Sequence, residues 1–507
     1  YDANNAKTYI VDAGDYYFTA ATDAHNAVNN ILAAKGYTVE NTDGRMTADG
    51  DVTLTYKWTN AALDSTTYAT SENGTAITNL FDEADPNKSS SEPGEVTWLS
   101  RSNWVATFPT QPVVLNATQT LADHLAFTRY DGSKADSVEM PTLGADNGLA
   151  LVSMIGADYD DPQWDTLLDQ LTFNEMVNTI TLGFHNTAAI ESIGKTRTKD
   201  ENGPQGLTAA LTGGASAMCY TSEDVMAATF NVDLINDVGR CIGEDCLAMG
   251  YSGLYGPGIN MHRTAYSGRN FEYYASDPFV AGTICAAEVN GIQSKGVYVY
   301  LKHVALNDSE SSRRGVNTWL NEQAAREIYL EVADKAVTDG GAWSVMTGFN
   351  RWGAYWCGAY DNLLTGFLRG ELGMRGMIIT DYSGSSKYMD LADGLIAGSD
   401  IWDSPDPTIH TTLAPKYEND AYIVTEMRES MHKILYTVAN SNAMNGWSSA
   451  DRLKVITPWW KTALYALDTV LAVLTVLCIW RLVVAIKRKK TWTAEQAANT
   501  ANAQNQQ

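Results

Sequence analysis

An aspartate at the end of an apolar run is the residue of this sequence best placed to do chemistry. Asp381 directly follows the Ile-Ile-Thr run of residues 378–380, so its carboxylate is expected to emerge at the edge of a sheet. Burying a carboxylate costs several kcal/mol unless it is paired or used. Taken alone, Asp381 could be a nucleophile, the N-cap of a helix or one half of a structural ion pair.

Two further apolar runs end in polar side chains. Lys302 and His303 close the run Val-Tyr-Val-Tyr-Leu. Asn350 and Arg351 follow a second run, which ends at Phe349. Adjacent strand residues point to opposite faces, so one member of the Lys-His pair could simply be packed away. At the exit of a strand this alternation relaxes, and both side chains could instead converge on a ligand.

These residues need a scaffold that gathers the ends of strands, and strands alternate with helices from about residue 149. Asp161-Pro162 opens one expected helix, and Thr172 with Glu175 forms the capping box of another. Roughly 250 residues of such alternation predict an α/β fold, and favour a (β/α)8 barrel of the TIM type over an open doubly wound sheet. No GxGxxG or P-loop motif follows a strand, so nucleotide binding has no support. The expected strands are residues 149–154, 296–303, 342–349 and 374–381, and further expected helices are residues 221–249, 321–338 and 363–372.

The composition excludes several classes of partner. The 507 residues are 45% hydrophobic and 19% charged, which is typical of a globular protein. A formal net charge of -25 argues against binding nucleic acid, because phosphate backbones need clustered cations. The six cysteines include no CxxC pair and no adjacent histidine cluster. They are therefore expected to be mostly buried thiols, and neither a metal site nor a cofactor is expected.

Residues 464–486 could cross a membrane as one helix. They are predominantly apolar, with no polar face across residues 470–480, and about 20 such residues span the hydrocarbon core. The basic run of residues 487–490 follows and favours a cytoplasmic C-terminus. A buried helix or an in-plane amphipathic helix is the alternative. We therefore expect a single-pass protein of the cell membrane, with residues 487–507 as a cytoplasmic tail that is unstructured from residue 491.

Several motifs together resemble the barrel domain of family 3 glycoside hydrolases. The resemblance covers about residues 149–403 and is strongest for the β-glucosidase and β-xylosidase branch. The sequence KHVALND lacks the KHFPG-type loop of the N-acetylglucosaminidase branch. The motifs are YGPGIN at residues 255–260, SGRNFEYYASDPFVAG at 267–282, LKHVALNDSESSRRGV at 301–316, EQAAREIYL at 322–330 and RGMIITDY at 375–382.

The resemblance implies a retaining, exo-acting β-glycosidase whose substrate is a β-linked oligosaccharide or glycoside. Asp381 aligns with the nucleophile that forms a covalent glycosyl-enzyme. Positive neighbours would keep that carboxylate ionised, as a nucleophile requires. A sugar offers many hydroxyl groups and no charge, so its recognition needs converging charged donors. The residues that align with binders of the terminal sugar are Arg269, Lys302, His303 and Arg313.

Three positions depart from the family pattern. Asn202 stands where an aspartate usually precedes Gly-Pro, and Asp200 lies two residues earlier. Phe349 replaces a tyrosine near the nucleophile, and Tyr382 replaces the tryptophan that commonly follows it. These departures are interpreted as a shift in sugar specificity, because Asp381 and the Lys-His pair remain.

A retaining glycosidase needs a second carboxyl group, the general acid/base, about 5 Å from the nucleophile. In the family it belongs to an α/β sandwich domain, which is expected upstream of this chain and would be its partner. The N-terminus resembles the last strands of a fibronectin-III-like β-sandwich, which implies a permuted domain order. The glutamates Glu272, Glu310 and Glu322 are expected in structural ion pairs or caps. The expected divisions are residues 1–120 for the sandwich remnant, a polar insertion and a linker, 121–445 for the catalytic barrel with C-terminal helices, 446–463 for a linker, 464–486 for the membrane helix and 487–507 for the tail.

Two other functions are compatible with the sequence. The chain could be a non-catalytic surface protein that binds carbohydrate on a decayed glycosidase barrel. It could also present glycans to a transporter. Covalent trapping of Asp381 separates an enzyme from both.

Overall fold

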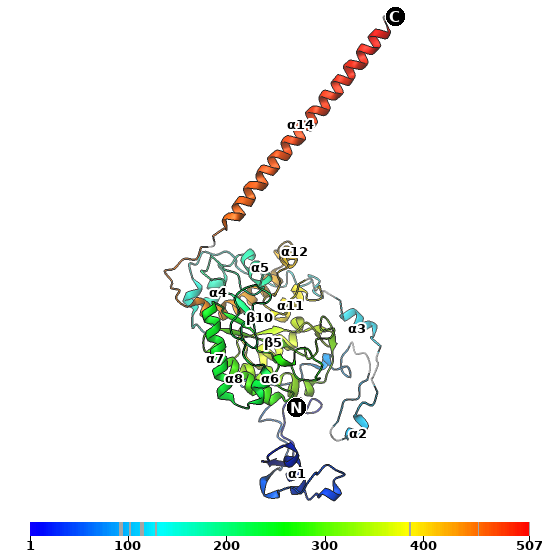
Figure 1. Cartoon of the computed structure of the whole chain (residues 1–507), viewed down its shortest axis with the longest axis vertical. Coiled ribbons are helices and arrows are strands. Elements are labelled where there is room, and N and C mark those ends of the chain that lie inside the picture. Colours follow the sequence, from blue (N-terminus) through cyan, green and yellow to red (C-terminus); the bar gives the residue numbers. More distant parts are fainter. Residues whose placement is uncertain are drawn as a thin grey trace. The chain divides into compact units, whose positions relative to one another are not determined.

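The computed structural model describes residues 1–90, 95–100, 103–111, 116–126, 129–384, 387–454 and 456–505. Within these residues the chain divides into two compact units, Tyr1–Arg452 and Leu453–Gln507 (Figure 1). The first unit holds the central sheet, its helices and a small N-terminal sheet. The second contains one long helix.

The central sheet has five parallel strands in the order β10-β7-β5-β4-β3. Every residue of β4, β5, β7 and β10 is buried, as expected of apolar parallel strands covered by helices. Three of the four strands predicted from the sequence are present as β5, β7 and β10. The bounds are β3 Asp200–Asn202, β4 Gly253–Tyr255, β5 Tyr298–Val304, β7 Ser344–Thr347 and β10 Ile378–Thr380.

Backbone hydrogen bonds continue the sheet beyond both end strands. Beside β10, Ile379 forms a parallel bridge with Ile401, and the Trp402 N–H donates to the Ile180 carbonyl at 2.8 Å. Beside β3, the N–H of Asp200 donates to the carbonyl of His185 at 3.0 Å. The sheet is therefore curled, and two short segments link its last strand back to its first. In the described residues this sheet has five regular strands, and the closed eight-stranded barrel stays a prediction.

Helices surround this sheet, and their caps follow the sequence. The capping box of Thr172 and Glu175 is formed at the start of α5, and α4 begins directly after Pro162. Helix α7 packs closely on α8 at Gly239, where a Cβ atom would lie 2.3 Å from the Glu288 carbonyl oxygen. The bounds are α4 Gln163–Leu168, α5 Phe173–Thr181, α6 Glu223–Ala228, α7 Val232–Met249, α8 Pro278–Gln293, α9 Glu322–Ala324, α10 Glu331–Thr338, α11 Leu391–Ala397, α12 Pro407–Tyr417 and α13 Ala421–Ala439, with π-helices η7 Ala325–Tyr329 and η9 Asn362–Glu371.

Two predicted elements are wrong. Residues 149–154 contain no strand, and Leu151–Met154 form a short 3-10 helix, because the buried side chains of Leu151 and Met154 are three residues apart and share one face of a helical turn. The single helix predicted for residues 221–249 is broken between α6 and α7. Phe230 lies in the left-handed region with φ 50°, and the side chain of Asn231 caps α7.

The prediction that the cysteines are mostly buried thiols holds for only three of the six. All six are free thiols, and three are exposed. The buried ones are Cys246, Cys285 and Cys357, and the exposed ones are Cys219, Cys241 and Cys478.

A two-stranded antiparallel sheet, β1 Gly14–Thr19 with β2 Thr55–Asn60, lies near the N-terminus with helix α1 Ala24–Ala34. A second small sheet contains the hairpin β8 Arg351–Trp352 and β9 Tyr355–Trp356, beside β6 Asn317–Thr318. This hairpin follows β7 directly. The remaining short elements are helices α2 Trp104–Thr107 and α3 Gln119–His124 and the 3-10 helices η1 Val39–Asn41, η2 Val52–Leu54, η3 Asp82–Ala84, η5 Leu151–Met154, η6 Asn270–Glu272, η8 Cys357–Ala359 and η10 Asn442–Met444.

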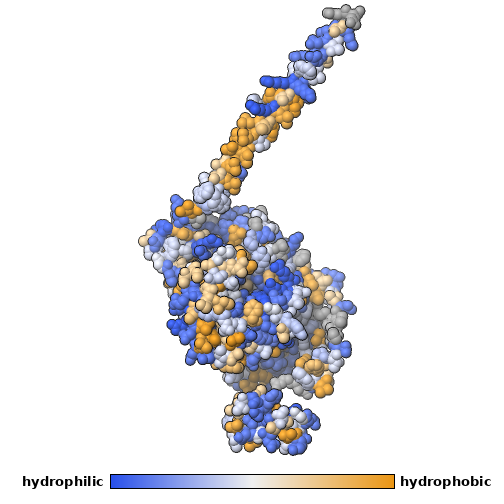
Figure 2. All heavy atoms as spheres, viewed as in Figure 1, coloured by the Kyte–Doolittle hydropathy of each residue, from blue (hydrophilic) through white to orange (hydrophobic). Residues whose placement is uncertain are grey.

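Helix α14, Trp459–Gln504, contains the apolar segment predicted from the sequence. It is the one helix of the described residues that is long and apolar enough to cross a membrane, and it is fully exposed. Figure 2 shows hydrophobic residues along its first part and hydrophilic ones beyond them. The tail expected to lack structure from residue 491 is helical as far as Gln504. Length and apolar composition alone are weak support for a membrane span.

Candidate active site

A cavity of about 460 Å³ opens at the carboxyl ends of the parallel strands. Residues at or just after the ends of β3, β4, β5, β7 and β10 line it, because parallel strands bring these ends to the same edge of a sheet. Loop residues, among them Arg269 and Arg313, complete the lining. The cavity contains all eight site residues predicted from the sequence, which are Asp381, Arg269, Lys302, His303, Arg313, Asn202, Phe349 and Tyr382.

The two carboxylate oxygens of Asp381 have different surroundings. Oδ1 accepts a hydrogen bond from the N–H of Tyr382 at 2.7 Å. Oδ2 is buried and has no hydrogen-bond partner among the described residues. Burial raises the pKa of Asp381 above its ordinary value, whereas Arg313, Arg269 and Lys302 oppose that rise. The carboxylate thus has one fixed oxygen and one free oxygen in a cationic environment.

The contacts of His303 fix its tautomer. Its Nε2 lies 3.1 Å from Nη1 of Arg269, and its Nδ1 lies 3.3 Å from Oδ1 of Asn260. Burial, with the nearby cations, lowers the pKa of His303 well below its usual value, so the ring is neutral. A guanidinium can only donate, so Nε2 accepts and Nδ1 carries the proton. The 3.5 Å contact between Nε2 and Oδ2 of Asp381 is therefore not an ion pair, which explains why Oδ2 is free.

Glutamates balance the cations around the nucleophile. Glu272 accepts from Nε of Arg269 at 3.1 Å and lies 3.8 Å from Nζ of Lys302. Glu310 pairs with Arg313 at 3.1 Å and with Arg269 at 3.6 Å. These two predicted ion pairs are confirmed, so neither carboxylate is free.

The third glutamate with an expected structural role lies elsewhere. Glu322 accepts from Arg326 Nε at 2.7 Å and from the backbone N–H groups of Leu80 and Phe81. Arg326 also donates to Glu371 at 2.7 Å. This buried ion network ties the segment before residue 82 to the helices of the central sheet.

The family of this domain follows from comparison with known proteins. A model of the glycosyl hydrolase family 3 N-terminal domain matches residues 184–409. This part of the chain is a family 3 glycoside hydrolase domain.

Its curated relatives include β-glucosidases. One from Rhizobium radiobacter is 34% identical over 240 residues, which are 47% of this chain and 29% of that protein. Thermostable β-glucosidase B from Acetivibrio thermocellus is 32% identical over 244 residues, 46% of this chain and 32% of that protein. The chain thus spans about a third of the length of these curated relatives. The family 3 domain is β-glucosidase-like.

Solved structures share the fold. β-Glucosidase 3B from Thermotoga neapolitana, in complex with α-D-glucose, has a TM-score of 0.50 and 26% identity, and the match covers 57% of this chain and 44% of that one. A β-glucosidase from Paenibacillus barengoltzii has a TM-score of 0.61, with 89% of this chain and 46% of that one covered. At 20% identity, the second match supports the fold alone.

Eight described residues that line the cavity of the family 3 domain were not predicted, and three of them are hydrogen-bonded to one another. The Tyr255 hydroxyl donates to Oδ1 of Asp403 at 3.3 Å and accepts from the His185 N–H at 3.1 Å. Burial raises the pKa of Asp403 to about 7. The sequence did carry one signal, because Asp403 follows the apolar pair Ile401-Trp402 much as Asp381 follows its own run.

The departures from the family pattern also lie in the cavity. Asn202 is held by its neighbour, since its N–H donates to Oε1 of Glu201 at 2.9 Å, and Glu201 in turn lies 3.3 Å from Nδ1 of His185. Asp200 lies below the cavity, where the hydroxyl groups of Tyr298 and Tyr300 donate to its two oxygens. Asp200 therefore does not take over the position of the missing aspartate.

Proposed function

We propose that this chain carries the nucleophile and the sugar-binding half of a retaining, exo-acting β-glycosidase. The enzyme would hydrolyse terminal β-linked sugars of oligosaccharides or glycosides through a covalent glycosyl-Asp381 intermediate. The observation that carries the proposal is the asymmetry of Asp381, which lines the same cavity as Arg269, Lys302 and Arg313. Its Oδ1 accepts from the Tyr382 N–H, whereas its Oδ2 is buried without a hydrogen-bond partner among the described residues.

In this proposal the free oxygen Oδ2 attacks the anomeric carbon and the bond from that carbon to the leaving oxygen breaks. Lys302, Arg269 and Arg313 donate to hydroxyl groups of the terminal sugar, and their charge favours the ionised nucleophile. His303 is neutral, so its ring orients the sugar without adding charge. Asn202, Phe349 and Tyr382 shape the remaining walls and bear on which sugar fits.

The leaving oxygen needs a proton from a second carboxyl group about 5 Å from the nucleophile. Among the described residues, Asp403 is the other carboxyl residue that lines the cavity, but it is 4% exposed and its Oδ1 is held by Tyr255. We assign the general acid/base to an α/β sandwich domain upstream of this chain.

The same proposal extends to the architecture. Residues 121–445 would form the closed (β/α)8 barrel, and residues 1–120 the end of a fibronectin-III-like domain with an insertion and linker. After the linker of residues 446–463, residues 464–486 would cross the cell membrane and leave residues 487–507 in the cytoplasm. The exposed apolar surface of α14 and the basic run that follows it support this anchor.

Trapping with 2,4-dinitrophenyl 2-deoxy-2-fluoro-β-glucoside tests the nucleophile directly. Dinitrophenolate departs without protonation, so labelling does not depend on the missing acid. Mass spectrometry of the digested chain should find a fluoroglucosyl group on Asp381, and Asp381→Asn should remain unlabelled. Asp237→Asn, whose side chain is 70% exposed on α7, is the matched control. Sugar binding without a label would contradict the proposal and support the carbohydrate-binding alternative.

A further inference from the structure

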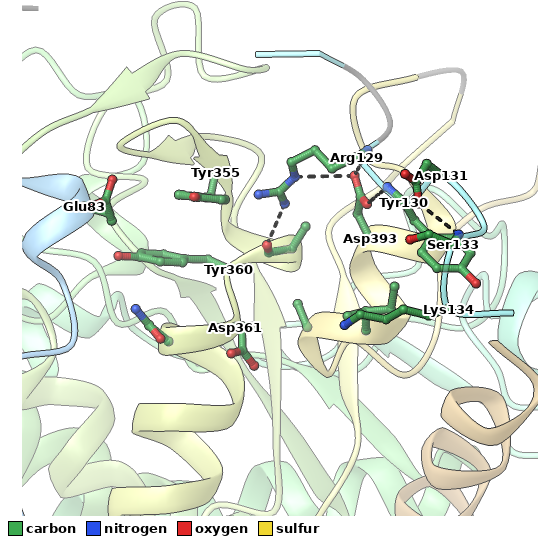
Figure 3. Close-up of a pocket in the computed structure, with 14 residues that line it drawn as sticks. Glu83, Arg129, Tyr130, Asp131, Ser133, Lys134, Tyr355, Tyr360, Asp361 and Asp393 are labelled. Carbon is green, nitrogen blue, oxygen red and sulfur yellow. Dashed lines mark hydrogen bonds and ion pairs between the residues drawn. The ribbon is translucent and has the colours of Figure 1, made fainter. Parts of the chain in front are cut away.

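A second cavity, of about 530 Å³, lies beside the hairpin of β8 and β9 (Figure 3). Among the described residues, none that lines it also lines the catalytic cavity. Its volume is in the range of small-molecule sites, which is about 300–1,000 Å³. We propose that this cavity is an accessory site for a neutral saccharide. The choice of a glucan as its ligand rests on the proposed function.

Aromatic rings form one wall of the accessory cavity. The rings of Tyr355 and Tyr360 stack with centroids 5.2 Å apart and an angle of 8° between their planes. The guanidinium of Arg129 lies 4.4 Å above the Tyr355 ring. The hydroxyl of Tyr360 is buried beside the side chain of Asn362, which also lines the cavity. The wall thus combines aromatic ring surface with the polar side chains of Arg129 and Asn362, as a sugar with its C–H and O–H groups requires.

The opposite wall is held in place by Asp393. This carboxylate accepts from the N–H groups of Arg129 and Tyr130, each at 2.9 Å. Arg129 also donates to the carbonyl of Ala359 at 3.0 Å, and Figure 3 shows it extending across the cavity. The Tyr130 hydroxyl donates to Asp420 at 2.8 Å. Both walls are therefore fixed before a ligand arrives, which reduces the entropy lost on binding.

The charges of the cavity disfavour an anion and offer partners to hydroxyl groups. Its four carboxylates outnumber the two cations, Arg129 and Lys134. The described residues also contain no group of three His, Cys, Asp or Glu side chains that could hold a metal ion. A hydroxyl group both donates and accepts, so it can bond to either kind of charged neighbour. The carboxylates that line the cavity are Glu83, Asp131, Asp361 and Asp393.

A short stretch of chain separates the two cavities. Phe349 lines the catalytic cavity, and its carbonyl accepts from the hydroxyl of Tyr388 at 2.9 Å. The next residues lead into β8, where the Arg351 guanidinium lies 4.9 Å over the Tyr388 ring. After the turn of the hairpin, Tyr355 reaches the accessory cavity. A glucan held there would raise the local concentration of chain ends near Asp381.

Calorimetry with cellotetraose tests the proposal. The full chain with Asp381→Asn is used, in a detergent without a sugar head group, because a maltoside would compete. Two molecules of cellotetraose should bind per chain. Adding Lys134→Ala and Asp361→Ala to this chain should raise the dissociation constant of one cellotetraose site, the accessory one, tenfold or more. The dissociation constant of the other site should stay unchanged. Both side chains are exposed, so the substitutions should not disturb folding. Asp237→Ala is the control.

Cleavage of 2,4-dinitrophenyl β-glucoside, whose leaving group needs no acid, separates this inference from the proposed function. With Asp381 intact, Lys134→Ala and Asp361→Ala should leave kcat/KM for this substrate unchanged. The accessory site would be overturned if one molecule of cellotetraose bound per chain with an affinity that neither substitution changed. It would also be overturned if the substitutions lowered cleavage of the aryl glucoside as much as they lowered binding of cellotetraose. A missing label on Asp381, with cellotetraose binding still sensitive to Lys134 and Asp361, would overturn the proposed function and leave the accessory site standing.

Discussion

Exchanging Glu272 for glutamine removes one negative charge from the cation cluster beside Asp381 and preserves the volume of the side chain. Glu272 binds Arg269 through Nε at 3.1 Å and through a shorter contact with Nη2, and Lys302 lies 3.8 Å away. A hydrogen bond to a charged group contributes about 1.5–3 kcal/mol. Arg269 would lose its alignment toward His303 and the sugar, so kcat/KM should fall about 10- to 150-fold, since 1.4 kcal/mol is about tenfold.

The same exchange should move the pH dependence. Glycosylation requires ionised Asp381, and burial raises the pKa of that carboxyl. With Glu272 neutral, Arg269 and Lys302 are less compensated and stabilise the carboxylate more, so the pKa of Asp381 falls. The acid limb of the rate profile should therefore shift to lower pH.

The assay is kcat/KM for 2,4-dinitrophenyl β-glucoside across an acid-to-neutral pH series. Glu310→Gln is the matched control, because Glu310 is more exposed and pairs with Arg313 and, at 3.6 Å, with Arg269. Partly exposed pairs contribute about 1 kcal/mol or less, so its loss should stay below about fivefold. Equal losses in both variants, or an acid limb that moves to higher pH, would refute the assignment of Glu272 as the residue that positions Arg269.

Three further outcomes are expected. In the wild-type chain, activity should be lost as pH falls through the raised pKa of Asp381, so the acid limb should lie above about 3.9, the ordinary value for an aspartate; a limb at or below that value contradicts it. Arg326→Leu leaves buried Glu322 and Glu371 without their cation and should lower the free energy of unfolding by about 3–5 kcal/mol in urea titrations followed by tryptophan fluorescence, so a loss under about 1 kcal/mol would speak against it. In a flotation assay the full chain should rise with lipid vesicles, whereas the chain ending at Arg452 should stay in solution. If the full chain remains below the vesicles, the membrane anchor is excluded.

The residues at the mouth of the sheet were predictable because they depend on local patterns. Asp381, Lys302 and His303 each end an apolar run, and parallel topology then brings those ends together whatever the loops between them do. Residues that depend on distant partners were missed. Tyr255 joins His185, 70 residues before it, to Asp403, 148 residues after it, and no periodicity in the sequence reports such a contact.

Local spacing also explains an error. Residues 149–154 are as apolar as a strand, but their two fully buried side chains, Leu151 and Met154, recur every third residue. A short apolar run does not show whether its buried residues repeat with the period of a strand or with that of a helical turn. The accessory cavity was likewise invisible, because its lining combines residues 129–134 with residues 355–362, which are far apart in the sequence.

The unequal oxygens of Asp381 also bear on the second half of the proposed reaction. A sugar carried on Oδ2 makes Oδ1 the carbonyl oxygen of an ester, and the Tyr382 N–H already donates to that atom. When water displaces the sugar, negative charge returns to the carboxylate, and a donor in place on Oδ1 makes it a better leaving group. The backbone at residue 382, rather than its side chain, would therefore help to release the product.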